Sequence, residues 1–237
     1  HQDGSFPELG WHIKGEMGGI WDHPIKLMDG FKVDLLWSNE NIVLDSAHTF
    51  VNYPFANKHE YSIPSKNIQI SRWQFVPDDK EGINIQYVFK NTSGTAQDFK
   101  LRFTGYSDLR PTWLGERTRM EDGNDTASFM SDEDAWLVKD DKNPWFVIFG
   151  ADRASTEHDE AKYGYSGKGT ARSLTYPIKI SGKGEKTITF TVAGSYSSES
   201  SILANFKDIG ENANIDLEQK KLRYQTLANN SKLTIPD

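Results

Sequence analysis

The sequence predicts a mainly β protein, an antiparallel β sandwich over roughly residues 10–195 that is followed by helices. Apolar and polar residues alternate in many short runs, with the period of a strand buried on one face. Clusters of Asn, Asp, Ser, Gly and Pro separate these runs, as turns do. No helix of ordinary length is signalled before residue 197. These three features are typical of an antiparallel β sandwich.

The clearest strand patterns lie at residues 83–90 and 98–105. In the second run, Phe99, Leu101 and Phe103 alternate with Lys, Arg and Thr, and the first run has the same period of two. The polar cluster Asn91–Thr95 lies between them and indicates a turn. We therefore expect the two runs to pair as an antiparallel hairpin.

Further strands are expected on the same grounds, and two kinds of loop separate them. The predicted strands are 31–37, 49–53, 68–75, 135–138, 145–149, 174–180 and 186–193. Before them, residues 11–31 are strand-like, with glycines that indicate turns or bulges. The acidic segments 121–125 and 132–134 are interpreted as solvated loops, because neither has the ligand pattern of a calcium loop. Residues 153–172 are interpreted as a long functional or mobile loop.

The last part of the chain changes to helical spacing. Ser197–Ser201 offers N-cap residues, and Leu203, Phe206 and Ile209 then recur at the helical period. A second helix is predicted over Asn214–Ala228, with apolar residues on two faces. Such a helix is covered on both faces, and we expect one of these covers to be missing from this chain. The chain is divided accordingly into a sandwich domain, 1–196, and a helical linker, 197–237, that ends as if cut between domains.

Composition excludes several classes of function. The 237 residues carry a net charge of −7, which argues against a general nucleic-acid binder or a binder of anionic membranes. No cysteine is present, so neither a disulfide framework nor a thiolate zinc site is possible. No apolar run is long enough to cross a bilayer. His12, Glu16, Asp22 and His23 match no helical metal-site spacing, so neither a metal nor a cofactor is predicted.

The segment from Gly105 to Arg117 is the main candidate for a functional loop. It follows a predicted core strand and contains the candidate site residues Asp108, Arg110, Trp113, Glu116 and Arg117. Functional loops often occupy such positions on a rigid scaffold. Two structural alternatives stay open: Asp108 and Arg110 pair locally to brace a turn, and Trp113 caps the core instead of offering its face to a sugar.

Three segments of the chain carry a resemblance to a known family: residues 15–31, residues 108–113, and residues 223–237. Together they resemble the N-terminal β domain of bacterial glycogen-debranching-enzyme-like glycoside hydrolases, six-hairpin glycosidases common in gut Bacteroidetes. The resemblance implies a sandwich of the supersandwich, galactose-mutarotase-like type, joined by a helical linker to an (α/α)6 barrel that supplies the general acid and base. It also implies a periplasmic or extracellular, soluble protein. Those catalytic carboxylates have no counterparts here, because the chain stops where the barrel would begin.

We therefore expect a non-catalytic accessory domain that packs on a catalytic barrel of the same polypeptide and is inactive alone. Its Asp108–Arg117 loop is expected to face that barrel, and an oligo- or polysaccharide is a further candidate partner. Two alternatives are kept. One is a free-standing carbohydrate-binding module that uses exposed Trp faces. The other is an aldose-epimerase-type enzyme, for which His48, His59 and His158 are the candidate acids, although no recognisable motif surrounds them.

Overall fold

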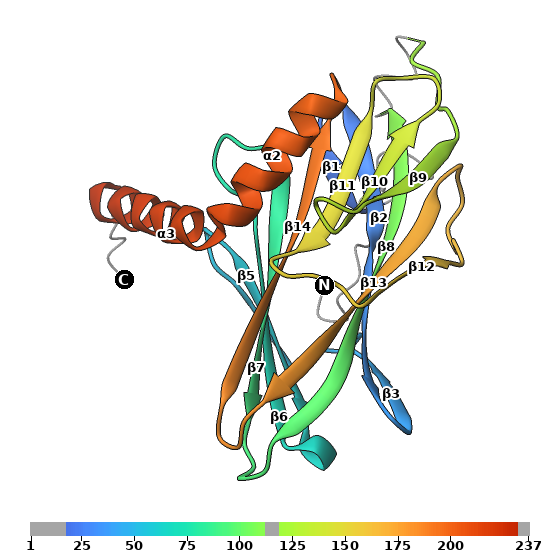
Figure 1. Ribbon diagram of the computed structural model, residues 1–237. Coiled ribbons are helices and arrows are strands. Elements are labelled where there is room, and N and C mark those ends of the chain that lie inside the picture. Colours follow the sequence, from blue (N-terminus) through green and yellow to red (C-terminus); the bar gives the residue numbers. More distant parts are fainter. Residues whose placement is uncertain (1–17, 112–118, 232–237) are drawn as a thin grey trace.

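The computed structural model describes residues 18–111 and 119–231 and shows two antiparallel β-sheets packed face to face, with two helices at the C-terminal end (Figure 1). The expected antiparallel sandwich with C-terminal helices is confirmed. Before residue 197, the described residues contain one helical element, a single 3-10 turn η1 at Pro64–Lys66. The described part of this region therefore has no helix of ordinary length, as the sequence predicts.

Among the described residues, one sheet has six strands and the other has eight. The six-stranded sheet runs in the order β1-β2-β8-β13-β12, with β3 paired to β2. Its strands are β1 (Ile20–Asp22), β2 (Ile25–Trp37), β3 (Glu40–Val43), β8 (Gln97–Pro111), β12 (Glu157–Ala161) and β13 (Thr170–Ile180). The eight-stranded sheet runs β4-β5-β6-β7-β14-β11-β10-β9. Its strands are β4 (Thr49–Asn52), β5 (Asn57–Ile63), β6 (Ile68–Phe75), β7 (Gly82–Asn91), β9 (Asp125–Met130), β10 (Ala135–Asp140), β11 (Phe146–Ala151) and β14 (Glu185–Ser195).

The core lies between the sheets and is rich in aromatic rings. Phe103 on β8 stacks on Phe190 of β14, with ring centroids 4.4 Å apart, and both side chains are buried. Each buried phenylalanine contributes on the order of 1.5–3 kcal/mol relative to an exposed one. The inward alternation of the strands explains why the sequence pattern predicts the sandwich so clearly.

The predicted hairpin between residues 83–90 and 98–105 is wrong. β7 pairs with β6 and β14, whereas β8 pairs with β2 and β13, so the two strands belong to different sheets. Their apolar faces meet across the core, where Phe89 and Phe99 lie 5.6 Å apart edge to face. Asn91 fixes the crossing, because its side-chain amide donates to the carbonyls of Thr95 and Ser181 at 2.7 and 3.0 Å.

Two segments expected to be loops contain strand. β8 continues to Pro111, so Asp108 and Arg110 belong to the strand and not to a loop after it. The long 153–172 segment contains β12 and the first residues of β13. The glycine prediction for the N-terminal region is confirmed in the part that the structure describes. The β2–β8 register shifts between Lys26 and Gly30, where Gly30 has a φ of +152°.

The helices pack on the eight-stranded sheet. α2 (Glu199–Glu211) begins at the N-cap Ser198, whose side chain accepts from the amide of Ser201, and it buries Ile202, Phe206 and Ile209. These residues contact an outer apolar cluster on β10, β11 and β14. α3 (Ala213–Asn230) extends away from the sandwich (Figure 1). The expected pair of helices is confirmed. Within α3 only Ala213 is buried and Leu217 packs beside it, so one apolar face lacks a cover in the described residues, as expected.

Candidate functional site

A buried ion cluster lies where the ends of β2 and β8 pair. Lys26 Nζ donates to both Asp29 Oδ1 and Asp108 Oδ2, the second contact at 3.0 Å. The exposed fractions of these side chains are 0% for Lys26 and 1% for each carboxylate. A buried charge is tolerated only when it is paired and hydrogen-bonded, and each member of this cluster meets that condition.

The irregular pairing of β2 makes the cluster possible. In a regular strand, residues three apart point to opposite faces. Here the register shifts between Lys26 and Met28 and again between Met28 and Gly30. The bulged backbone therefore lets Lys26 reach Asp29 on its own strand and Asp108 on the neighbouring strand. Bulges that redirect a side chain in this way are common beside functional sites.

The segment between β12 and β13 covers the cluster. The hydroxyl of Tyr163 donates to Asp29 Oδ2 at 2.6 Å. Burial, together with this bond to Asp29, raises the pKa of Tyr163, so its hydroxyl stays protonated. Gly167 has a φ of +143°, and a Cβ added to it would lie 2.8 Å from Asp108 Oδ1. Only glycine fits there, which places this segment directly against the buried carboxylate.

The ionisation of Asp29 is a balance of opposing effects. Burial raises its pKa, whereas hydrogen bonds from Lys26 and Tyr163 lower it and the nearby charge of Asp108 raises it. The net direction is upward from the usual value of 3.8. The two donors hold the carboxylate in one place, so it is poorly suited to take a proton from a substrate.

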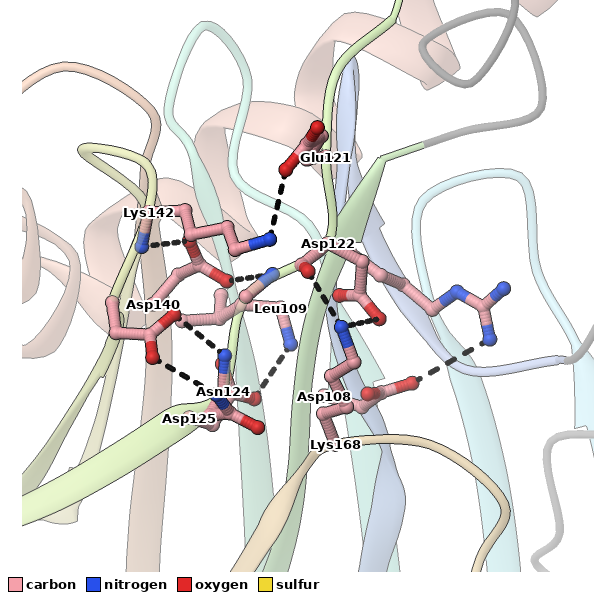
Figure 2. Close-up of polar contacts among 12 residues, drawn as sticks. Asp108, Leu109, Glu121, Asp122, Asn124, Asp125, Asp140, Lys142 and Lys168 are labelled. Carbon is pink, nitrogen blue, oxygen red and sulfur yellow. Dashed lines mark hydrogen bonds and ion pairs between the residues drawn. The ribbon is translucent and has the colours of Figure 1, made fainter.

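A second carboxyl group, that of Asp125, lies beside the same strand end (Figure 2). Its Oδ2 accepts from the amide of Leu109 at 2.8 Å, while its buried Oδ1 has no hydrogen-bond partner among the described residues. Burial, with smaller effects from nearby carboxylates that include Asp108 and Asp140, raises its pKa from 3.8 to about 8. At neutral pH this carboxyl group therefore carries its proton, unlike an ordinary surface aspartate.

The acidic segment 121–125 is only partly the solvated loop that the sequence predicted. Asp140, which is 1% exposed, accepts from the amides of Gly123, Lys142 and Asn143 at 2.8, 2.9 and 2.7 Å, and so ties this segment to the turn after β10 (Figure 2). Lys168 donates to the carbonyl of Asp122 at 2.7 Å. The buried carboxylate of Asp140 is thus satisfied by backbone donors, as buried polar groups generally are.

The structure places two of the five site residues named from the sequence. Asp108 is buried, and the side chain of Arg110 is 30% exposed, with its Nη1 3.9 Å from Asp108 Oδ2. Both lie on β8, two positions apart and therefore on the same face. They form a local pair, but it braces no turn, and the shorter contact of Asp108 is to Lys26. Trp113, Glu116 and Arg117 lie outside the described residues.

Sequence reasoning missed Lys26, Asp29 and Tyr163. The sequence does contain one signal. Lys26 lies inside the apolar run Ile25–Met28, and Asp29 follows that run directly. Charged residues in such a run are almost never buried unless they are paired. The partner across the sheet, Asp108, is separated by 82 positions, so only the pairing of β2 with β8 identifies it.

The cluster has the chemistry of a structural clamp. Both carboxylates are held by Lys26, and among the described residues no group of three or more His, Cys, Asp or Glu side chains is arranged to hold a metal ion. Of the three histidines of the epimerase alternative, His158 lies apart from the other two. It stacks on Phe129 of β9, with ring centroids 3.8 Å apart, and β9 is at the far edge of the eight-stranded sheet from β5. His59 lies on β5, and the amide of His48 donates to the carbonyl of Glu60 on the same strand at 2.9 Å.

A second notable surface is the outer side of α3. Ile215 and Leu222 lie on this side and are 55% and 64% exposed. The opposite side of the helix is anchored to the sandwich: Lys220 and Arg223 pair with Asp78 at 3.0 and 2.9 Å. Because the helix is held firmly on one side, its exposed apolar side chains form a fixed surface.

Solved structures share this fold at low sequence identity. A protein designated a kojibiose phosphorylase from the human microbiome matches 84% of this chain and 28% of its own, with a TM-score of 0.53 and 13% identity. A bacterial glucoamylase complexed with acarbose matches 85% of this chain and 32% of its own, with a TM-score of 0.57 and 9% identity. The likeness shows the fold alone, and this chain spans about a third or less of either protein.

The other comparisons identify no family. No protein-family model matches the sequence, and no curated protein matches it. An aldose 1-epimerase from Escherichia coli K12 is a weaker structural neighbour, with a TM-score of 0.47 and 7% identity. Within the described part of the chain, no helix is both long and apolar enough to cross a membrane.

Proposed function

We propose that this chain is the non-catalytic β-sandwich domain of a carbohydrate-active glycoside hydrolase of the glycogen-debranching type. In this proposal it packs on an (α/α)6 catalytic barrel, which supplies the general acid and base. The observation that carries the proposal is the pair of fold matches above. Each covers more than four fifths of this chain but less than a third of a much longer carbohydrate-active protein.

The exposed side of α3 supports the packing part of the proposal. Two large apolar side chains, Ile215 and Leu222, are more than half exposed on a helix whose other side is ion-paired to the sandwich. Contacts between domains of one chain bury a modest area, on the order of 600–1,500 Å², and exposed apolar side chains such as these are suited to be buried there. The barrel is the occupant that we assign to this surface.

The geometry of the carboxylates supports the non-catalytic part. Inverting glycoside hydrolysis needs one carboxylic acid and one free carboxylate on opposite sides of the scissile bond, about 6.5–9.5 Å apart. Asp29 and Asp108 share a single lysine and are almost completely buried. They stabilise the end of β8, from which the Asp108–Arg117 segment leads towards the proposed barrel.

The proposal also includes a substrate class and a location. The substrate class is an oligo- or polysaccharide, and the location is periplasmic or extracellular.

The test uses the longer natural protein and this chain side by side. Replacing Ile215 and Leu222 by serine should lower the unfolding temperature and the glycosidase activity of the longer protein, and leave the stability of this chain nearly unchanged. Gln219→Ser, at an exposed polar position on the same helix, is the matched control. A double variant that behaves like Gln219→Ser in the longer protein would contradict the packing proposal.

A carbohydrate-binding module is the second candidate, and one aromatic cluster favours it. Tyr53 stacks on Phe55 and Trp73 at 5.3 and 5.6 Å, and is itself 36% exposed. These rings line a groove of about 310 Å³ beside Leu217 of α3. Flat aromatic faces suit the apolar face of a sugar ring. A glycan array on this chain, with Tyr53→Ala as the variant, separates the two candidates: only the module predicts binding that the substitution removes.

A further inference from the structure

Arg72 is a buried cation between the two sheets. It lies on β6, is 3% exposed, and its guanidinium faces two aromatic rings, Phe31 of β2 at 5.7 Å and Tyr61 of β5 at 5.9 Å. Among the described residues it has no ion pair, and its buried Nε has no hydrogen-bond acceptor. Arginine stays protonated in proteins, so this charge cannot be removed by a change in pKa.

Two hydroxyl groups close to Arg72 lack an acceptor among the described residues. The buried hydroxyl of Tyr61 has no hydrogen-bond partner there, and that of Tyr87 interacts only with the guanidinium of Arg72, which is a donor. Burial raises the pKa of both phenols, against the lowering effect of the Arg72 charge, so both keep their protons as donors. A buried charge and two buried donors that lack acceptors are costly, and this cost falls when an acceptor binds among them.

A cavity gives access to this place. It has a volume of about 440 Å³, within the range of small-molecule sites, and Arg72 lines it. Lys32 and Lys162 add two further positive charges to the lining, against the single carboxylate of Asp45; Lys32 also pairs with Asp34, outside the lining, at 3.1 Å. Asp45 makes no ion pair with Arg72 within the described residues. The lining is therefore net positive and leads to a desolvated guanidinium, which favours an anionic occupant.

The wall of the cavity also offers aromatic surface. Tyr106 of β8 and Tyr165 of the β12–β13 segment line it, with their rings 5.3 Å apart edge to face. Tyr165 is 45% exposed, so an incoming ligand can reach it. A guanidinium recognises a planar carboxylate through two parallel hydrogen bonds, while a tyrosine ring packs against the apolar face of a sugar.

We propose that this cavity binds a monosaccharide that carries a carboxylate, a hexuronate, with Arg72 holding the carboxylate and Tyr106 and Tyr165 packing on the ring. Lys32 and Lys162 attract the anion to the entrance. The anionic part of the inference rests on Arg72 and the lining charges. The sugar part rests on the proposed carbohydrate-related function.

Isothermal titration of this chain with D-glucuronate, D-glucose and inorganic phosphate tests the proposal. Glucuronate should bind more tightly than either of the other two, and should raise the unfolding temperature. Equal binding of glucuronate and phosphate would overturn the sugar part, and absence of binding by both anions would overturn the whole proposal. These outcomes are independent of the packing of α3 in the longer protein, so the two proposals fail separately.

Four variants sharpen the test. Arg72→Met should weaken glucuronate binding by about tenfold or more, and should not lower the unfolding temperature of the free protein, because an unpartnered charge is removed. Lys162→Gln, on an exposed residue, should weaken binding about two- to fivefold. Asp45→Asn should tighten binding, since a like charge is removed. Lys179→Gln is the control, because the side chain of Lys179 is 77% exposed and does not line the cavity. Unchanged affinity in Lys162→Gln and Asp45→Asn would overturn the assignment to this cavity even if Arg72→Met failed to fold.

Discussion

Lys26 Nζ donates a hydrogen bond to Asp108 Oδ2 at 3.0 Å, and neither side chain exposes more than 1% of its surface. This contact joins two strands that are distant in sequence and fixes the end of β8 from which the candidate interdomain segment leads. Because Lys26 also pairs with Asp29, one ammonium group compensates two buried carboxylates. The stability of this strand end therefore depends on a single residue.

Lys26→Met should destabilise the isolated chain by about 3–5 kcal/mol, because it leaves the two carboxylates buried without their counter-ion. Urea unfolding monitored by tryptophan fluorescence measures the change. Lys100→Met is the matched control: it removes a surface pair with Glu157, whose partners are 49% and 47% exposed, and should cost about 0–1 kcal/mol. The clamp interpretation is wrong if the two variants lose similar stability.

The raised pKa of Asp125 predicts a pH dependence of stability. Its carboxyl group binds a proton in the folded protein up to about pH 8 but only up to about 3.8 when unfolded. The folded state thus holds more protons between these values, and the free energy of unfolding contributed by this group falls as the pH rises from about 4 to 8. Asp125→Asn keeps an acceptor for the Leu109 amide and removes this dependence.

The expected result is that Asp125→Asn and the wild type have similar urea midpoints near pH 4, and that the variant is more stable at pH 8. Asp141→Asn is the control. Hydrogen bonds from Asn124 lower the pKa of Asp141, so the contribution of this group to stability changes with pH only below about pH 4. A wild-type midpoint that rises between pH 5 and 8 relative to that of Asp125→Asn would contradict the assignment.

Two glycines of the β12–β13 segment should respond oppositely to the same change. Gly167→Ala forces a Cβ at a φ of +143° and against Asp108, and should cost about 1–3 kcal/mol. Gly164→Ala meets open space and should be neutral or stabilise by up to about 1 kcal/mol through the unfolded state. Thermal unfolding of the two variants measures this difference. Equal effects would show that the segment does not pack on Asp108.

The sandwich could be predicted from the sequence, but the strand pairing could not. Alternation such as that of Phe99, Leu101 and Phe103 specifies which face of a strand is buried. The same face is buried whether two consecutive strands pair within one sheet or lie in opposite sheets across the core, so the pattern does not identify the partner strand. Phe89 and Phe99 meet across the core, and nothing in the local pattern distinguishes this from a hairpin contact. The crossing depends on Asn91, whose acceptor Ser181 is 90 positions away.

The candidate site was predictable only in part, for a similar reason. Asp108 and Arg110 were identified by residue type and by their place at a strand end. Their burial and partners depend on a bulge in β2 and on the Tyr163 segment, neither of which has a local signature. The helices were predicted well, because the Ser198 cap and the spacing of Phe206 and Ile209 are local features.

The central claim is that this chain supports catalysis without performing it. Release of reducing sugar from starch, maltooligosaccharides and aryl glycosides, measured for this chain alone and for the longer protein proposed above, tests it most directly. The account predicts release by the longer protein and none by this chain. Sugar release by the purified chain, at a rate comparable to that of the longer protein, would contradict it.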